Sequence, residues 1–386
     1  MTKVRPIWVV IAILVIAVIL RPPVAQIGPI LDLIQSKLSL TDTETALLAA
    51  IPVLCFGFGA FATPALARRF GENQTMVGLL VLLFMAIAAR PYLGFVGLLV
   101  GTTLAGLSIA VANVLLPTIV RARFPKKVVP LTAGYTTILA ASASFAAAFS
   151  YPSASNYGWQ MALELWALPA LLALGLSFTF LSEKSERLVP ETDGHAGDFK
   201  LISRSPIAWS IIGLFGIQSL GFYALLAWLP NFAIDSGMNP SDAGALLSLM
   251  TVVGVPVGLI LSSNFGRFKN LAPVGALISM VTIAGMVLLL LHLWVPAVIV
   301  IGIGQASSFP LSLSLISTRA GSGRLTTMLS SVSQGVGYLL AASGTFLFGW
   351  LAKVTGNWQI SVSGLIALTA VQVVAAWFAG RPKVIQ

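Results

Sequence analysis

The sequence predicts an all-helical membrane protein with twelve membrane-spanning helices, and three observations lead to this fold class. Hydrophobic residues make up 57% of the 386 residues and charged residues only 9%, with a mean hydropathy of +0.95. A soluble domain usually contains about 25% charged residues. Apolar segments of about 19 residues recur along the whole chain. The basic residues lie mostly in the short stretches between these segments.

Twelve segments are long and apolar enough to cross a bilayer, since about 20 helical residues span its core. In chain order the expected helices are 7–34, 44–67, 74–90, 94–120, 130–152, 161–181, 206–234, 242–264, 271–291, 294–316, 325–352 and 358–379. One long polar stretch separates the sixth from the seventh. We therefore expect an N-terminal six-helix bundle at 1–181, a flexible cytoplasmic linker at 182–205 and a C-terminal six-helix bundle at 206–386.

The distribution of basic residues predicts the orientation in the membrane. Lys3 and Arg5 precede the first apolar segment as in a signal peptide, but no small-residue cleavage site follows, so we interpret it as a retained span. If the N-terminus is cytoplasmic, that side of the membrane receives 18 of the 22 Lys and Arg residues. Cytoplasmic loops of membrane proteins carry such an excess, which predicts that both termini are cytoplasmic.

The two halves of the chain resemble each other. Four short matches keep their order at offsets of 194 to 200 residues, close to half the chain length, and they begin at Pro6 and Pro206, Ala46 and Ala245, Leu131 and Leu325, and Trp159 and Trp358. Each half contains six spans, an even number, so both halves start on the same side of the membrane. The repeats are therefore parallel and related by a pseudo-two-fold axis along the membrane normal. Transporters of this plan bind their substrate between the halves and expose it alternately to the two sides.

Arg21 is the most informative residue of the chain. It lies inside the first apolar segment, about 20 Å along a helix that starts at Ile7. Burying a guanidinium at that depth costs at least about 2.5–3.5 kcal/mol, so such a residue usually faces a cavity, a partner or a substrate. The second half has no basic counterpart, which favours a substrate or gating role. The alternative is that Arg21 caps carbonyl groups freed by Pro22 and Pro23.

Uncharged polar residues at similar depth complete the candidate site, because amides and Tyr hydroxyls can donate to an anion or a nitro oxygen. Any one of them could instead form a hydrogen bond between helices. The substrate-binding candidates besides Arg21 are Gln26, Asn113, Tyr135, Tyr223, Trp228, Gln305, Gln334 and Tyr338, and Gln218 lies at comparable depth.

We also make predictions for Arg90, Asp32 and the segment around Gly302. Arg90 ends the short third helix, and we expect its side chain to extend to the outer membrane interface. Asp32, near the outer end of the first segment, is the candidate proton site. The small residues around Gly302 predict close helix packing rather than a dinucleotide site, since no strand precedes them.

Other function classes find little support in the sequence. The net charge of +10 is spread over loops between apolar segments, which argues against nucleic-acid binding. Cys55 is the single cysteine, and His195 and His292 both lie outside the expected helix centres, so we expect no metal, no cofactor and no catalytic triad. We expect a monomer in the lipid bilayer that handles a small-molecule solute.

Several strings distributed over nearly the whole chain resemble the major facilitator superfamily, and more narrowly the bacterial cyanate and 2-nitroimidazole transporter family. They are LRP at 20–22, ARRFG at 67–71, NVLLP at 113–117, LTAGY at 131–135, AWLP at 227–230, SQGVGYLLAA at 333–342 and GNW at 356–358. The 2-nitroimidazole branch is the more similar, chiefly through Asn113 and the 131–135 string. The resemblance implies a bacterial inner-membrane transporter.

The loop after the second helix departs from the superfamily pattern of Gly, three residues, Asp-Arg, one residue, Gly and two basic residues. Arg69 and Gly71 match this pattern, and we take them as gating candidates. Pro64 stands in place of the first Gly and Arg68 in place of the Asp, while Glu72 begins the stretch that should be basic. These departures argue against the charge relay usually assigned to this loop.

The expected function is secondary active transport of a small polar or anionic solute, cyanate-like or nitroimidazole-like, by alternating access, with protons as the candidate coupling ion. The main alternative is a proton-coupled multidrug exporter of the same fold. Exporters of cations generally need a buried carboxylate, and no Asp or Glu lies at the depth of Arg21. A membrane enzyme would need a nucleophile, metal set or paired acids, and a non-transporting sensor would normally carry a soluble domain.

Overall fold

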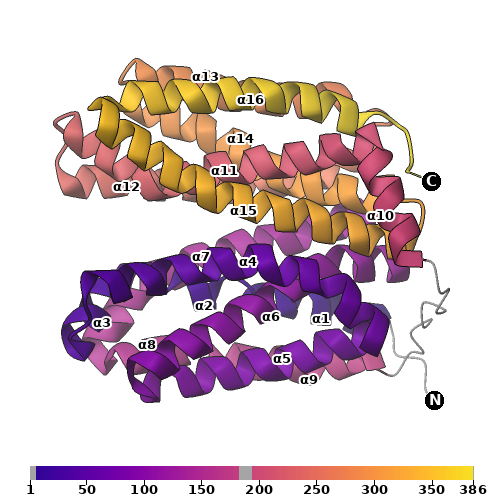
Figure 1. Ribbon diagram of the computed structural model, residues 1–386, viewed down its shortest axis with the longest axis horizontal. Helices are drawn as coiled ribbons and strands as arrows, with labels where there is room; N and C mark the ends of the chain where they lie inside the picture. Colours follow the sequence, from indigo (N-terminus) through magenta and orange to yellow (C-terminus); the bar gives the residue numbers. More distant parts are fainter. Residues whose placement is uncertain (1–5, 182–193, 386) are drawn as a thin grey trace. The chain divides into compact units, whose positions relative to one another are not determined.

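The computed structural model describes residues 6–181 and 194–385 and shows an almost entirely helical chain (Figure 1). Twelve helical segments of the described chain are long and apolar enough to cross a membrane. The only β-type pairing among the described residues is an isolated bridge between Ala320 and Ile385. The predicted all-helical class with twelve spans is therefore confirmed.

The helices of the first half follow the expected segments closely, apart from breaks in the first and sixth. They are α1 (Pro6–Ile19), α2 (Pro22–Ala25), η1 (Gly28–Ile30), α3 (Leu31–Leu38), α4 (Asp42–Phe70), α5 (Glu72–Ala89), η2 (Arg90–Tyr92), α6 (Gly94–Arg123), α7 (Val128–Tyr157), α8 (Trp159–Glu164) and α9 (Ala167–Leu181).

The helices of the second half begin inside the polar stretch. They are α10 (Gly194–Arg204), α11 (Pro206–Asp235), α12 (Pro240–Asn264), η3 (Phe265–Arg267), α13 (Ala272–Leu290), α14 (Trp294–Arg319), α15 (Gly323–Thr355) and α16 (Trp358–Gly380).

The structure differs from the expected flexible linker over the residues of α10. Asp198 on this helix is buried and accepts hydrogen bonds from Arg324 at the start of α15, with Arg324 Nη2 3.1 Å from Oδ1 and Nε bonded to Oδ2. Ile202, one helical turn later, is also buried. An ion pair with a buried carboxylate and a buried apolar side chain lie on one face of α10, so the helix packs against unit 2 despite its polar composition. Residues 182–193 of the expected linker lie outside the described residues.

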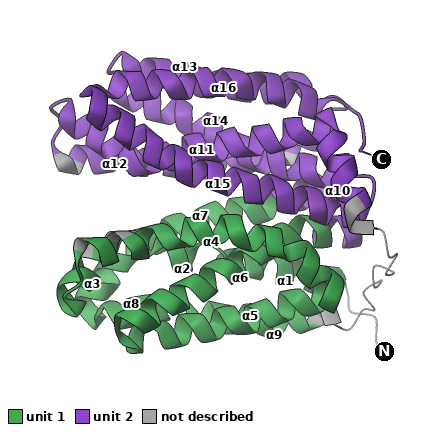
Figure 2. Cartoon of the chain, viewed as in Figure 1, with its two compact units in different colours: residues 1–119, 134–194 green, residues 120–133, 195–386 purple. Residues whose placement is uncertain are grey.

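The chain divides into two compact units (Figure 2). Unit 1 comprises Met1–Ile119 and Gly134–Gly194, and unit 2 comprises Val120–Ala133 and His195–Gln386. The first six candidate spans therefore belong to unit 1 and the last six to unit 2, except that the adjoining ends of α6 and α7 are assigned to unit 2.

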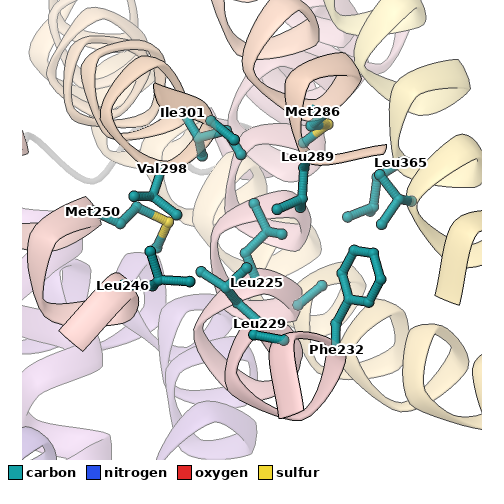
Figure 3. Close-up of a cluster of buried hydrophobic side chains, with 14 of the residues drawn as sticks. Leu225, Leu229, Phe232, Leu246, Met250, Met286, Leu289, Val298, Ile301 and Leu365 are labelled. Carbon is teal, nitrogen blue, oxygen red and sulfur yellow. The ribbon is translucent and has the colours of Figure 1, made fainter. Parts of the chain in front are cut away.

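Unit 2 is held together by an apolar cluster contributed by all six of its membrane-spanning helices, α11 to α16 (Figure 3). Leu225 and Leu229 of α11 lie among side chains such as Met250, Leu289 and Ile301 from the surrounding helices. Aromatic rings extend the cluster: the Phe232 ring centroid is 5.0 Å from that of Trp294 and 6.0 Å from that of Trp358. Tryptophans at helix ends are typical of the membrane–water interface.

In unit 1 a second cluster anchors the segment that follows the break in the first span. Ile27, Ile30 and Ile34 from this segment are buried against side chains of α4, α6, α7 and α8, among them Trp159 and Leu163. This packing fixes the C-terminal part of the first span, after the break, against the other helices of unit 1.

Close helix contact at Gly302 is confirmed, because a Cβ atom added there would lie 2.4 Å from the backbone oxygen of Met250 on α12. We predict that Gly302→Val lowers the unfolding midpoint of the detergent-purified protein, since overpacking costs about 1–3 kcal/mol. Gly364→Ala on α16 is the matched control, because no atom lies within 4 Å of its added Cβ. Equal thermal midpoints for the two variants would contradict this packing.

Candidate functional site

The first span is interrupted where the sequence places Arg21, Pro22 and Pro23. Neither proline has an N–H group, so the carbonyls of Val18 and Ile19 lose their helical donors and α1 ends at Ile19. A short helix restarts at Pro22, with Arg21 as its N-cap residue at φ −118° and ψ −41°. The Arg21 carbonyl accepts from the N–H groups of Val24 at 3.1 Å and Ala25 at 3.0 Å.

The Arg21 side chain is half-buried and reaches toward α4. Its guanidinium carbon lies 5.8 Å from the ring centroid of Phe56, which is almost fully buried. A guanidinium at this distance is attracted to the aromatic ring, and the attraction grows where water is excluded. The sequence did not identify Phe56, and one aromatic residue in an apolar helix gives no signal of such a contact.

The expectation for Arg90 is wrong, because its side chain is only 1% exposed and does not extend to the interface. The guanidinium instead donates from Nη2 to the Pro23 carbonyl at 2.9 Å and from Nη1 to Thr102 Oγ1 at 3.3 Å. The physical reason is the break itself. Ile27 N–H donates to Val24 O at 3.2 Å rather than to Pro23 O, so the Pro23 carbonyl takes a side-chain donor.

Gln26 follows the short helix and is fully buried. Its Nε2 donates to the Leu163 carbonyl at the end of α8 at 3.3 Å, while its Oε1 has no hydrogen-bond partner among the described residues. The amide therefore ties the break to α8 in this structure. Contact between Gln26 and a solute stays a prediction.

Asn113 on α6 and Tyr135 on α7 are also buried side chains of unit 1. Neither lies at the protein surface, so a solute would have to enter the helix bundle to meet them. Their substrate role likewise stays a prediction.

In unit 2, two of the polar residues at membrane depth come together. Gln218 Nε2 on α11 donates to Gln305 Oε1 on α14 at 3.3 Å, and both side chains are buried. Gly221, one helical turn after Gln218, leaves the space that the Gln305 amide occupies, because an added Cβ would lie 3.2 Å from Gln305 Nε2. The absence of a side chain at 221 thus makes room for a polar group inside an apolar bundle.

An aromatic group lies on α11 and α15 of the same unit. Tyr338 packs edge to face against Phe215, with ring centroids 5.5 Å apart, and also contacts Tyr223 at 6.3 Å. Gln334, one turn before Tyr338, donates to Ser330 Oγ at 2.8 Å. Unit 2 therefore offers neutral amides and aromatic rings, whereas the cation Arg21 belongs to unit 1.

Trp228 lies further along α11 and makes contacts typical of a packing residue. Its Nε1 donates to the Thr345 carbonyl at 2.8 Å, and its ring centroid is 5.9 Å from that of Trp358. Gly349 leaves room for the indole, since a Cβ there would be 2.3 Å from the ring. Whether Trp228 also contacts a solute stays a prediction.

The gating candidates lie at the end of α4. Arg69 is exposed, and its guanidinium carbon is 5.2 Å from the Phe70 ring centroid. Gly71 joins α4 to α5 at φ 84° and ψ 153°, a conformation that is open essentially only to glycine. Asp32, the candidate proton site, lies on α3, and its side chain lies outside what the structure describes.

The described residues offer no alternative site built on a metal. No three His, Cys, Asp or Glu side chains of the described chain come together as metal ligands. Cys55 is buried and is not paired in a disulfide.

A comparison with known families identifies the fold. Residues 7–338 match the family described as the Major Facilitator Superfamily. The chain belongs to the major facilitator superfamily. It is therefore a multi-pass membrane transporter rather than an enzyme, in agreement with the family resemblance of its sequence strings.

Two curated superfamily members illustrate the relationship. The 2-nitroimidazole transporter of Escherichia coli strain K12 is 34% identical over 385 residues, which cover 97% of this chain and 95% of the relative. The cyanate transport protein CynX of the same organism is 26% identical and covers 93% of this chain and 95% of its own length.

Solved structures of the superfamily share the fold. The proton:xylose symporter XylE superimposes with a TM-score of 0.82 at 12% identity, covering 98% of this chain and 97% of its own. The transporter FucP in the outward conformation gives a TM-score of 0.80 at 15% identity, covering 98% of this chain and all of its own.

For Trp228 we predict a structural role. Trp228→Phe removes the hydrogen bond to Thr345 O, which contributes about 0.5–1.5 kcal/mol to stability. A lower unfolding midpoint in detergent with an unchanged KM for transport is the expected result. Trp377→Phe on the exposed face of α16 is the control. A normal midpoint combined with a raised KM would instead favour contact with the solute.

Proposed function

We propose that this protein is a secondary active transporter that moves a small polar or anionic solute across the bacterial cytoplasmic membrane by alternating access, with both termini in the cytoplasm. The solute class is a nitroimidazole-like compound or a cyanate-like anion. The observation that carries the proposal is Arg21, a half-buried guanidinium at a break in a membrane-spanning helix.

The chemistry of Arg21 supports a solute with acceptor atoms. A charged side chain inside a membrane span costs free energy, and such residues usually face a cavity, a partner or a substrate. The Arg21 guanidinium carbon lies over the Phe56 ring at 5.8 Å, and the N–H groups of a guanidinium bind planar acceptors in a forked arrangement. A nitro group presents two oxygens with a geometry similar to that of a carboxylate, so it suits such a fork.

The relatives support the same solute class. The 2-nitroimidazole transporter and CynX both align over nearly the full length of this chain. Of these two relatives, the 2-nitroimidazole transporter has the higher identity to this chain, 34% against 26%. We therefore place nitro-bearing heterocycles first among the solutes to test.

The alternative, export of cationic drugs, is supported less well. A buried carboxylate would be needed to bind the cation inside the membrane. Among the described side chains the buried carboxylate is Asp198, which lies on α10 before the first span of unit 2 and is already bonded to Arg324. Protons remain the proposed coupling ion.

We predict that Arg21→Ala lowers kcat/KM for uptake about 10- to 150-fold, the effect of losing a hydrogen bond from a charged donor worth about 1.5–3 kcal/mol. Arg21→Lys should give an intermediate loss, since it keeps the charge but not the planar fork. The measurement is uptake of 2-nitroimidazole, cyanate and related small anions into proteoliposomes, with and without a proton gradient.

The control variant is Arg267→Ala, which removes an exposed arginine from η3. It should leave uptake unchanged at equal protein incorporation. Normal uptake by correctly inserted Arg21→Ala protein would exclude Arg21 as a solute-binding residue and with it the proposed solute class.

A further inference from the structure

Arg90 is the largest side chain among those that are almost fully buried in the described chain. It lies where α5 gives way to η2, and Gly101 on α6 lies against it, since an added Cβ would be 2.4 Å from Arg90 Cβ. Its hydrogen bonds go to two neutral groups, Thr102 Oγ1 and the Pro23 carbonyl, and its Nε has no partner among the described residues. Nothing in the proposed transport function yet uses this cation.

A buried guanidinium is an expensive way to satisfy one carbonyl. A neutral amide could donate to Pro23 O without the desolvation cost of a charge. Hydrogen bonds from a charged donor are, however, about twice as strong as those between neutral groups. The Pro23 carbonyl is therefore held more firmly than an ordinary cap would hold it.

The bond to Pro23 acts close to Arg21. Only Pro22 separates the two residues, and the proline rings fix φ at Pro22 and at Pro23 itself. A restraint on the Pro23 carbonyl is consequently transmitted along a stiff stretch of backbone to Arg21. Thr102 on α6 gives the guanidinium its second attachment, so the break is tied to a neighbouring membrane-spanning helix.

We propose that Arg90 is a positioning residue for solute recognition: it anchors the break in the first span through Pro23 O and thereby fixes the direction of the Arg21 side chain. This inference rests on the proposed function for its consequence in transport. The anchoring itself does not depend on which solute is carried.

The first test measures the mobility of the break directly. In a Cys55→Ser background, a cysteine introduced by Val24→Cys lies at a half-buried position next to Pro23. Adding Arg90→Gln should raise the rate of labelling of this cysteine by a soluble thiol reagent about fivefold, because the carbonyl loses its charged donor. A cysteine introduced by Tyr157→Cys, at the exposed end of α7, should label at an unchanged rate.

The second test asks whether the anchor acts through Arg21. Arg90→Gln should raise the KM for 2-nitroimidazole about tenfold, since small misplacements of a binding group are costly. The same substitution added to Arg21→Ala should have no further effect on KM, because neighbouring groups that act as one unit are not additive. Thr102→Val, which leaves the Pro23 bond in place, should change KM by less than Arg90→Gln does.

These outcomes separate the inference from the proposed function. Faster labelling at position 24 supports the anchor even if Arg21→Ala transports normally and the proposed function fails. Unchanged labelling and unchanged KM in folded Arg90→Gln protein would overturn the inference. Arg90→Lys keeps a cation and should give smaller changes than Arg90→Gln. If neither variant yields folded protein in the membrane, Arg90 acts in folding rather than in positioning, and the inference falls.

Discussion

The requirement that every backbone polar group inside a membrane find a partner within the protein governs the candidate site. Pro22 and Pro23 interrupt the first span, and after them Ile27 N–H bonds Val24 O, which leaves the Pro23 carbonyl without its helical donor. The Pro23 carbonyl is bonded by Arg90, and Gln26 bonds α8 just beyond the break. The interruption is thus a structured element with its own hydrogen bonds, and it leaves Arg21 outside regular helix where its side chain can approach Phe56.

The two units contribute different chemistry to the bundle interior. Unit 1 contains the cations Arg21 and Arg90 at or near the break, whereas the hydrogen bonds described between α11 and α14 and within α15 of unit 2 join amides and hydroxyls. The sequence repeats reproduce the scaffold in both halves, yet Arg21 has no basic counterpart at the matching position of the second half. A transporter can keep a symmetric scaffold and still specialise its halves, because the fold depends on apolar packing and recognition depends on a few polar groups.

The sequence predicted the twelve spans well because span length and hydropathy follow directly from the thickness of the bilayer. It also pointed to Arg21, since a charge inside an apolar segment is visible without a structure. It misplaced Arg90, because a cation near a helix end can equally reach water or turn inward, and only the position of the Pro23 carbonyl decides between them. It missed the helical character of Gly194–Arg204 for a similar reason: Asp198 finds Arg324 126 residues away. Pairings between distant residues, such as Gln218 with Gln305, have no local signal.

The contrast between the two arginines shows how burial divides the roles that a charged residue can take in a membrane protein. Arg90 is almost fully buried, and its guanidinium donates a charged hydrogen bond to the backbone carbonyl of Pro23. Its proposed effect is therefore on the stretch of backbone that contains Pro23. The Arg21 side chain is only half-buried, and the proposed function assigns it to a solute that enters the bundle. Because Arg90 bonds the carbonyl of Pro23 and Arg21 directly precedes the two prolines, the proposed anchor acts on Arg21 through a short stretch of backbone with fixed φ. In this proposal the binding group, Arg21, lies two residues before the carbonyl that Arg90 holds, and Arg90 lies at a helix end that the sequence alone would assign to the membrane surface.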